Sequence, residues 1–238
     1  MVEPSGLHRS EQFRRTKRRG RNQAKHGKKP SENPGLTAIR GYFSDVLDDE
    51  VRASFEAALD SLRSAGAVVS QAEIPDAAEI APIYVHIVLS EAAVYHAATL
   101  ESMPDRYTAP VRQRLELGRY ILAEDYVRAL AGRDTLRRHV DAVLSACDAL
   151  VLPTLPIPAP LLGAEHVHVG TSDQPVRNVM LRLTQLFNLT GHPAVSLPCG
   201  LTSERLPCGL QIAGARSRTE ELLAMSAAVE RCLMSNDR

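Results

Sequence analysis

The chain contains 238 residues, which is enough for one large domain or two small ones. Hydrophobic residues make up 44% and charged residues 24%, proportions that are ordinary for a soluble globular protein. No run of about 18 uncharged apolar residues occurs, so we expect no membrane span. Four cysteines are too few for a disulfide scaffold and no signal peptide is visible, so we expect a cytoplasmic protein.

The formal net charge of zero hides two segments of opposite charge. Residues 1–35 contain ten Lys or Arg against three Glu, a net charge of +7, and the remaining 18 basic and 25 acidic side chains give residues 36–238 a net charge of −7. The first segment has few apolar residues to bury, so we predict a disordered basic leader over 1–35. Such a tail could bind nucleic acid, but its basic run has no interleaved aromatic residue, which favours a solvated extension.

From Gly35 onward, helical and strand patterns alternate. Asp48 is placed to cap a helix whose apolar positions continue to Leu62. Gly66 ends this helix, and the apolar residues after it predict a buried strand at 67–70.

Three helices are predicted next, over residues 78–101, 108–118 and 123–146. In the first of them, the helical spacing places Ile83, Ile87 and Val94 on one face. We expect that face to be buried.

The last third of the chain adds the remaining strands of the sheet. The run 149–153 is an apolar strand, and 174–190 has a helical pattern. Two short strands at 195–197 and 210–212 form a hairpin-like unit. A final helix begins near Ser217 or Thr219, since Ser217 and Glu220 have the spacing of a capping box. Together these elements predict an α/β fold, with a mixed sheet covered by helices.

Three segments near the end of the chain resemble the C-terminal part of amidase signature family enzymes: 187-FNLTGHPAVSLPCG-200, 206-LPCGLQIAG-214 and 219-TEELLAMSAAVE-230. The family pattern is matched at Asn188, Gly191, Pro193, Ala194, Pro198, Gly200, Leu206, Pro207, Gly209 and Gln211. The resemblance covers about residues 36–234 and implies an amide-hydrolysing fold.

The resemblance also shows what this chain lacks. Amidase signature enzymes use a serine nucleophile, a second serine in a cis peptide unit and a lysine base, with backbone N–H groups at the oxyanion. Here no Ser-Ser or Gly-Gly dipeptide occurs, and Lys17, Lys25, Lys28 and Lys29 all lie in the predicted leader. We therefore assign no catalytic residue and no cofactor, and we expect a C-terminal half that is inactive alone.

One substrate-binding residue is implied by the resemblance. In amidotransferase-type relatives, an arginine in a Val-x-x-Arg stretch lies near the carboxylate of the substrate, and Arg114 is the closest match here, with Arg112 two residues before it. The alternative for both is a salt-bridged helical arginine. The relatives also tend to carry an acidic residue shortly before Asn188, and its absence from residues 180–187 argues against a glutamine or asparagine substrate.

The other candidate sites favour structural roles. Cys199 and Cys208 could bind a metal together, form a disulfide, or simply lie next to each other on a hairpin. The family pattern favours the last alternative, in which both are small residues that pack in the interior. His166 and His168 could share one face of an extended segment, but no third ligand is evident, so we assign no metal site. Asp148 matches a structural position of the family.

Two hypotheses on function follow. In the first, the chain is a hydrolase subunit or remnant that lines the cleft for a small amide substrate, while the catalytic half is absent or lies on a partner chain. The isolated half then self-associates or needs that partner. In the second, the chain is a non-catalytic interaction protein whose basic leader binds nucleic acid or acidic partners.

Overall fold

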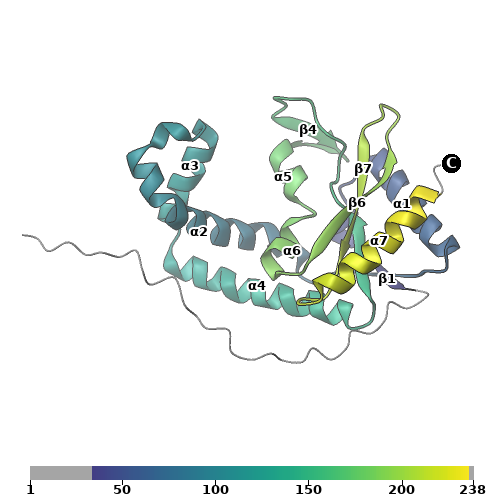
Figure 1. Ribbon diagram of the computed structural model, residues 1–238. Helices are drawn as coiled ribbons and strands as arrows, with labels where there is room; N and C mark the ends of the chain where they lie inside the picture. Colours follow the sequence, from purple (N-terminus) through teal and green to yellow (C-terminus); the bar gives the residue numbers. More distant parts are fainter. Residues whose placement is uncertain (1–33, 236–238) are drawn as a thin grey trace, which may run out of the picture.

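The computed structural model describes residues 34–235, so residues 1–33 of the predicted leader and residues 236–238 lie outside the described part. The described chain folds around a five-stranded mixed sheet with the strand order β2-β1-β3-β7-β6 (Figure 1). β1 pairs in parallel with both β2 and β3, whereas β7 is antiparallel to β3 and to β6. The predicted α/β class with a mixed sheet is confirmed.

The strands are short except for the hairpin. They are β1 Gly35–Ile39, β2 Val68–Ala72, β3 Ala149–Pro153, β6 Ala194–Leu201 and β7 Pro207–Ala213, and a separate two-stranded sheet holds β4 His166–Val169 and β5 Ser172–Pro175. The predicted hairpin is confirmed, with both strands longer than expected. β1 was not predicted, although Gly35 opens it.

The helices are α1 Asp49–Ser64, α2 Ile80–Ser102, α3 Ala109–Leu117, α4 Ala123–Leu144, α5 Val176–Leu181, α6 Gln185–Thr190 and α7 Thr219–Ser235. Short 3-10 helices lie at η1 Gly41–Phe43, η2 Ala77–Glu79, η3 Pro104–Arg106 and η4 Gly118–Tyr120. Asp48 caps α1 as predicted, because its side chain accepts hydrogen bonds from the backbone N–H groups of Glu50 and Val51.

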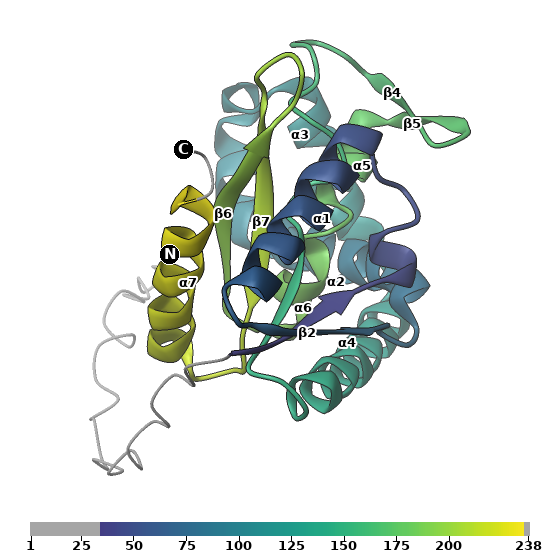
Figure 2. The ribbon, with the colours of Figure 1, turned by 90° about the vertical axis from the view of Figure 1, so that its right-hand side faces the viewer.

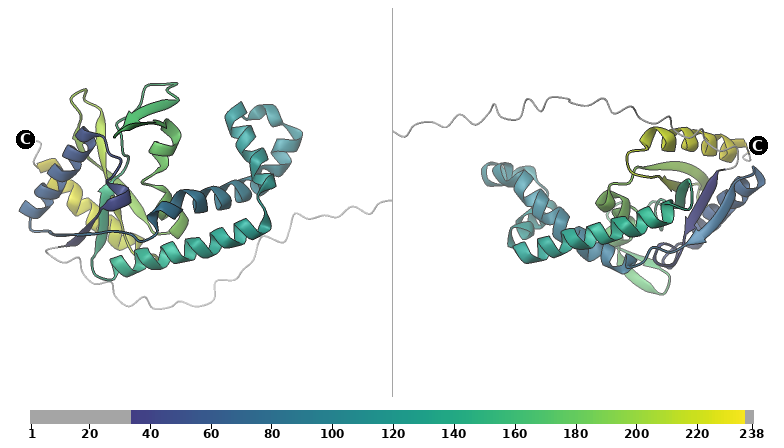
Figure 3. Two further views of the ribbon diagram at one scale, coloured as in Figure 1. Left: turned by 180° about the vertical axis from the view of Figure 1, so that it is seen from behind. Right: turned by 90° about the horizontal axis from the view of Figure 1, so that it is seen from below.

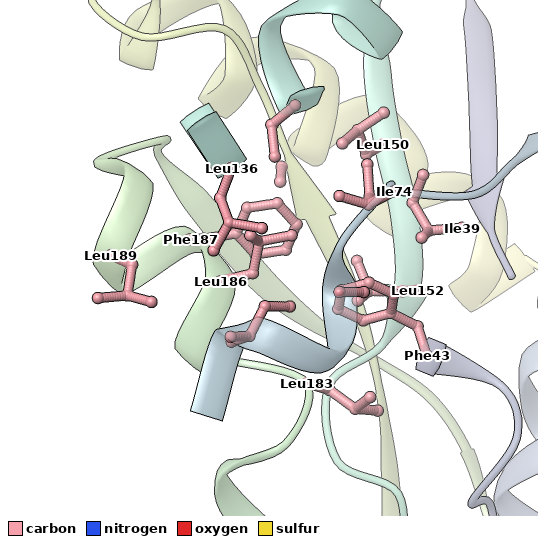
Figure 4. Packing of buried hydrophobic residues seen from close by; sticks show 14 of the residues in the cluster. Ile39, Phe43, Ile74, Leu136, Leu150, Leu152, Leu183, Leu186, Phe187 and Leu189 are labelled. Carbon is pink, nitrogen blue, oxygen red and sulfur yellow. The ribbon is translucent and has the colours of Figure 1, made fainter. Parts of the chain in front are cut away.

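The sheet lies between two helical layers (Figure 2). α1 and α7 pack on one face, where they bury Phe55 and Leu222 against alternate strand residues such as Val151. On the opposite face, Leu150 and Leu152 of β3 pack with residues from α2, α4 and α6 (Figure 4). All five residues of β3 are buried, because both faces of this central strand are covered.

Helices α2, α3 and α4 form an arm that extends away from the sheet (Figures 1 and 3). α2 packs against α4 and α3, and only four of its residues are buried: Ile80, Ile87, Ala93 and Leu100. By length and composition alone, the helical stretch Ala77–Ser102 could span a membrane. This is weak evidence, since a core helix of a soluble protein passes the same test.

Four details of the sequence prediction are wrong. β2 is an exposed edge strand instead of a buried one, and Val68 is 65% exposed. Val94, placed on the buried face of α2, is 81% exposed. The single helix expected over 174–190 is instead β5, α5 and α6. Ser217 has a left-handed φ of 66° and lies two residues before α7, so it does not form the capping box.

Candidate functional site

Arg112 and Arg114 both lie on α3, and the structure separates their roles. Arg112 forms ion pairs with Asp105 at 3.5 Å and Glu116 at 3.8 Å. Arg114 is half-buried, and its side chain forms no ion pair or hydrogen bond within residues 34–235. The salt-bridged alternative therefore fits Arg112, and the Arg114 guanidinium is left available to a ligand.

A second arginine interacts electrostatically with Arg114. Arg177 is on α5, and its pKa is lowered by desolvation and then by the positive charge of Arg114, while Tyr84 of α2 acts in the opposite direction.

A polar cluster joins α4 to the turn that follows α6. The side chain of His192 is fully buried; its Nδ1 lies 2.8 Å from Oγ1 of Thr190, and its Nε2 lies 3.0 Å from Oδ1 of Asp141. Arg216 donates to the other oxygen of Asp141 at 2.9 Å, and Arg137 donates to the Thr190 carbonyl at 2.9 Å. The cluster resembles a catalytic triad in composition. Because Thr190 has no exposed surface, however, the cluster serves as a structural link between α4 and the turn after α6.

This cluster predicts a pH-dependent stability. Desolvation lowers the pKa of His192 below its ordinary value of 6.5, although the Asp141 carboxylate opposes the shift. Because the folded pKa lies below the unfolded one, the unfolded state binds the proton more readily. The contribution of His192 to the free energy of unfolding is therefore complete above about pH 6.5, and it is lost as the pH falls from there through the pKa of the folded state.

We expect the urea midpoint of unfolding to decrease as the pH is lowered from about 8 to about 5. The fall should be smaller in His192→Gln, while His168→Gln, at an exposed hairpin position, should behave as the wild type. An unchanged slope in His192→Gln would show that other groups cause the dependence.

The remaining candidates take structural positions. His168 lies 2.9 Å from Asp173 across the exposed β4–β5 hairpin, and residues 34–235 hold no group of three ligands fit for a metal. Asp148 accepts a hydrogen bond from the Gly35 backbone at 2.9 Å, which anchors the start of β1.

The two hairpin cysteines are free and pack within the core. Cys199 lies at the irregularity in β6, beside the pair Gly200 and Cys208. Desolvation raises the pKa of Cys199 to about 12, with a smaller effect from Cys208. A thiol with such a pKa stays protonated and is a poor nucleophile or metal ligand.

Comparison with known proteins relates this fold to amide-hydrolysing enzymes. A sequence model of the family described as amidase matches residues 8–223. An amidase of Pseudomonas putida is 40% identical over 169 residues, which cover 70% of this chain and 36% of the relative. A glutamyl-tRNA(Gln) amidotransferase subunit of Acidobacterium capsulatum is 32% identical over 219 residues, covering 79% of this chain and 44% of the relative.

A solved structure agrees with these sequence matches. The crystal structure of an amidase superposes with a TM-score of 0.80 at 32% identity, covering 85% of this chain and 46% of the other. The chain thus spans less than half the length of the relatives that it matches. By its sequence and by its fold, the chain belongs to the amidase signature family and holds part of the family's domain.

Proposed function

We propose that this chain forms the C-terminal, substrate-cleft half of an amide-hydrolysing domain and does not hydrolyse amides by itself. The observation that carries the proposal is chemical: the chain has no lysine after Lys29 and no Ser-Ser pair, while its relatives are more than twice as long as the matched segment. A hydroxyl nucleophile without a base is weak, so the remaining cleft cannot replace the missing groups.

Arg114 supplies the substrate contact in this proposal. It lies on the arm, unpaired within the described chain, at the position that the family resemblance marks for binding of the substrate. The substrate is a small amide, and Arg114 orients it by an interaction remote from the bond that breaks. Such remote binding contributes to hydrolysis only when the catalytic half holds its nucleophile beside the same amide.

The partner in this proposal is the rest of the amidase domain, whether joined to this half or supplied by another chain. The arm supports this assignment, because it exposes a set of large apolar side chains: Val85, Val94, Tyr95, Val111, Leu117, Tyr120, Leu122 and Val127. A shallow, open depression over α3 and η4 is lined by Gln113, Glu116, Leu117 and Tyr120. An apolar surface of this kind favours association, so the isolated chain should self-associate when the partner is absent.

The test measures ammonia release from a panel of aliphatic and aromatic amides. The purified chain should give none above background. Mixing it with the separately produced N-terminal part of the Pseudomonas putida amidase should give a 1:1 complex by size-exclusion chromatography and restore hydrolysis. A direct fusion of the two parts, which raises their effective concentration, serves as the second form of the experiment.

Two results would contradict the proposal. One is hydrolysis by the chain alone that disappears when one of its own serines is replaced by alanine. The other is a fused protein that melts cooperatively as one unit yet releases no ammonia. Light scattering on the isolated chain should show species larger than a monomer, and the complex should suppress them.

A further inference from the structure

We infer that β2 is an interaction surface and that its partner is the β2 strand of a second copy of this chain. Two chains related by a twofold axis would join their five-stranded sheets into one continuous sheet. This pairing goes beyond the proposed function and does not depend on it, because it uses no part of an amide-hydrolysing site.

The outer side of β2 carries backbone groups that face no other strand within residues 34–235. Toward β1, the N–H of Val68 donates to a carbonyl at 3.1 Å, and the carbonyl of Ala72 accepts from an N–H at 2.9 Å. Because the backbone groups of successive strand residues point to opposite sides, Val69 and Gln71 direct theirs away from β1. Two N–H groups and two carbonyls therefore lie along this edge, on the side of the molecule that faces the viewer in Figure 2.

The sequence of β2 has none of the features that usually protect the edge of a sheet. The strand 68-VVSQA-72 contains no charged residue and no proline, and its register with β1 is regular over all five residues. β6, the strand at the other edge, contains Pro198 and an irregularity in its register beside that proline. An unprotected edge strand is a template for pairing with another chain, so β2 is the edge at which we expect association.

The edge groups of β2 match those of a second β2 in one antiparallel register. If Ser70 lies opposite Ser70 of the second copy, Val69 lies opposite Gln71, and their N–H and carbonyl groups bond in both directions. All four edge groups of each strand are then paired. A register centred on Val69 would instead place Gln71 opposite Ala67, whose N–H already donates to the Leu62 carbonyl at 2.9 Å.

The charges and the symmetry also fit a dimer. Glu73, the first charged residue after β2, would lie opposite the uncharged Ala67 of the second copy, so no like charges face each other. The same edge is used by both chains, so the assembly closes after two copies. Two five-residue edges bury less surface than a standard interface, and we expect a dissociation constant of about 0.1 mM or higher. A dimer this weak is sparse in dilute solution and has to be trapped covalently.

The test traps the pair through single cysteines in the full chain. Opposed residues of a non-hydrogen-bonded antiparallel pair have Cα atoms about 4.5 Å apart, which a disulfide can bridge. Ser70→Cys should therefore give a disulfide-linked dimer on a non-reducing gel after oxidation with copper–phenanthroline. The wild-type chain, whose four cysteines are free, gives the background.

Val68→Cys is the matched control, because Val68 is 65% exposed on the same strand. In the proposed register it lies four residues, or about 13 Å, along the strand from its own counterpart, too far for a disulfide. Ser70→Cys should cross-link at least about tenfold faster than Val68→Cys. A mixture of Val68→Cys and Ala72→Cys should form the mixed dimer, since these two positions are directly opposed.

A second variant removes one edge donor. Gln71→Pro, added to Ser70→Cys, deletes an N–H that points away from β1, so the native ladder is kept and cross-linking should fall to the background. Equal rates in Ser70→Cys and Val68→Cys would overturn the inference, because random collision would then explain both. Full cross-linking in a double variant that circular dichroism shows to be folded would do the same. If the double variant does not fold, the mixture decides, and mixed dimer no more abundant than the Val68→Cys homodimer contradicts the proposed register.

Discussion

Replacing Leu152 with alanine should destabilise the protein by about 2–5 kcal/mol. Leu152 is fully buried on the central strand β3, where it packs in the cluster beneath α2, α4 and α6 (Figure 4). Truncation removes apolar contacts and leaves a cavity that the neighbouring strands β1 and β7 cannot close, since both are held by ladder hydrogen bonds. Urea unfolding followed by circular dichroism measures the loss.

Leu162→Ala is the matched control, because this side chain is fully exposed in the loop after β3. Its free energy of unfolding should stay within about 0.5 kcal/mol of the wild type. A Leu152→Ala protein that unfolds at the wild-type urea midpoint would show that β3 is not the centre of the core.

Replacing Gly118 with alanine should displace the outer end of the arm, at a cost of about 3 kcal/mol or more. A Cβ atom at Gly118 would lie 2.1 Å from the Leu89 carbonyl oxygen and 2.9 Å from Cβ of Ala93. Both atoms belong to α2, and the carbonyl is fixed in the helix, so the contact is relieved only when η4 moves away from α2. Amide hydrogen exchange of α3, which is joined directly to η4, should therefore accelerate.

Gly35→Ala is the control for this change. The Cβ atom there would have its nearest contact at 3.6 Å, with Oδ2 of Asp148, which is an ordinary van der Waals distance. We expect hydrogen exchange in α3 to match the wild type. Equal exchange in Gly118→Ala would mean that α2 and η4 are not closely packed.

Local patterns predicted the elements whose residues determine their own conformation. The Asp48 cap, the proline-free pattern of α4 and the all-apolar run of β3 needed no knowledge of the rest of the chain. The alternating helix and strand patterns also predicted the α/β class, and the family resemblance singled out Arg114.

The errors arise where distant contacts decide the outcome. Val94 has helical spacing with Ile87, yet it is exposed because the arm extends beyond the sheet that would cover it. β2 has strand composition, but its position at the sheet edge leaves Val68 exposed.

The parallel pairing of β1 with β3 determines the order in which the chain can fold. The hydrogen bond from Gly35 to Asp148 joins residues 113 positions apart. Closing so long a segment costs entropy before any strand contact repays it, and non-local pairing slows folding. During synthesis, the helices of the arm leave the ribosome before β3 and can form from local contacts, whereas β1 emerges earlier but must wait for β3 to pair with it. The rate-limiting step in folding should therefore be the assembly of the sheet around β3.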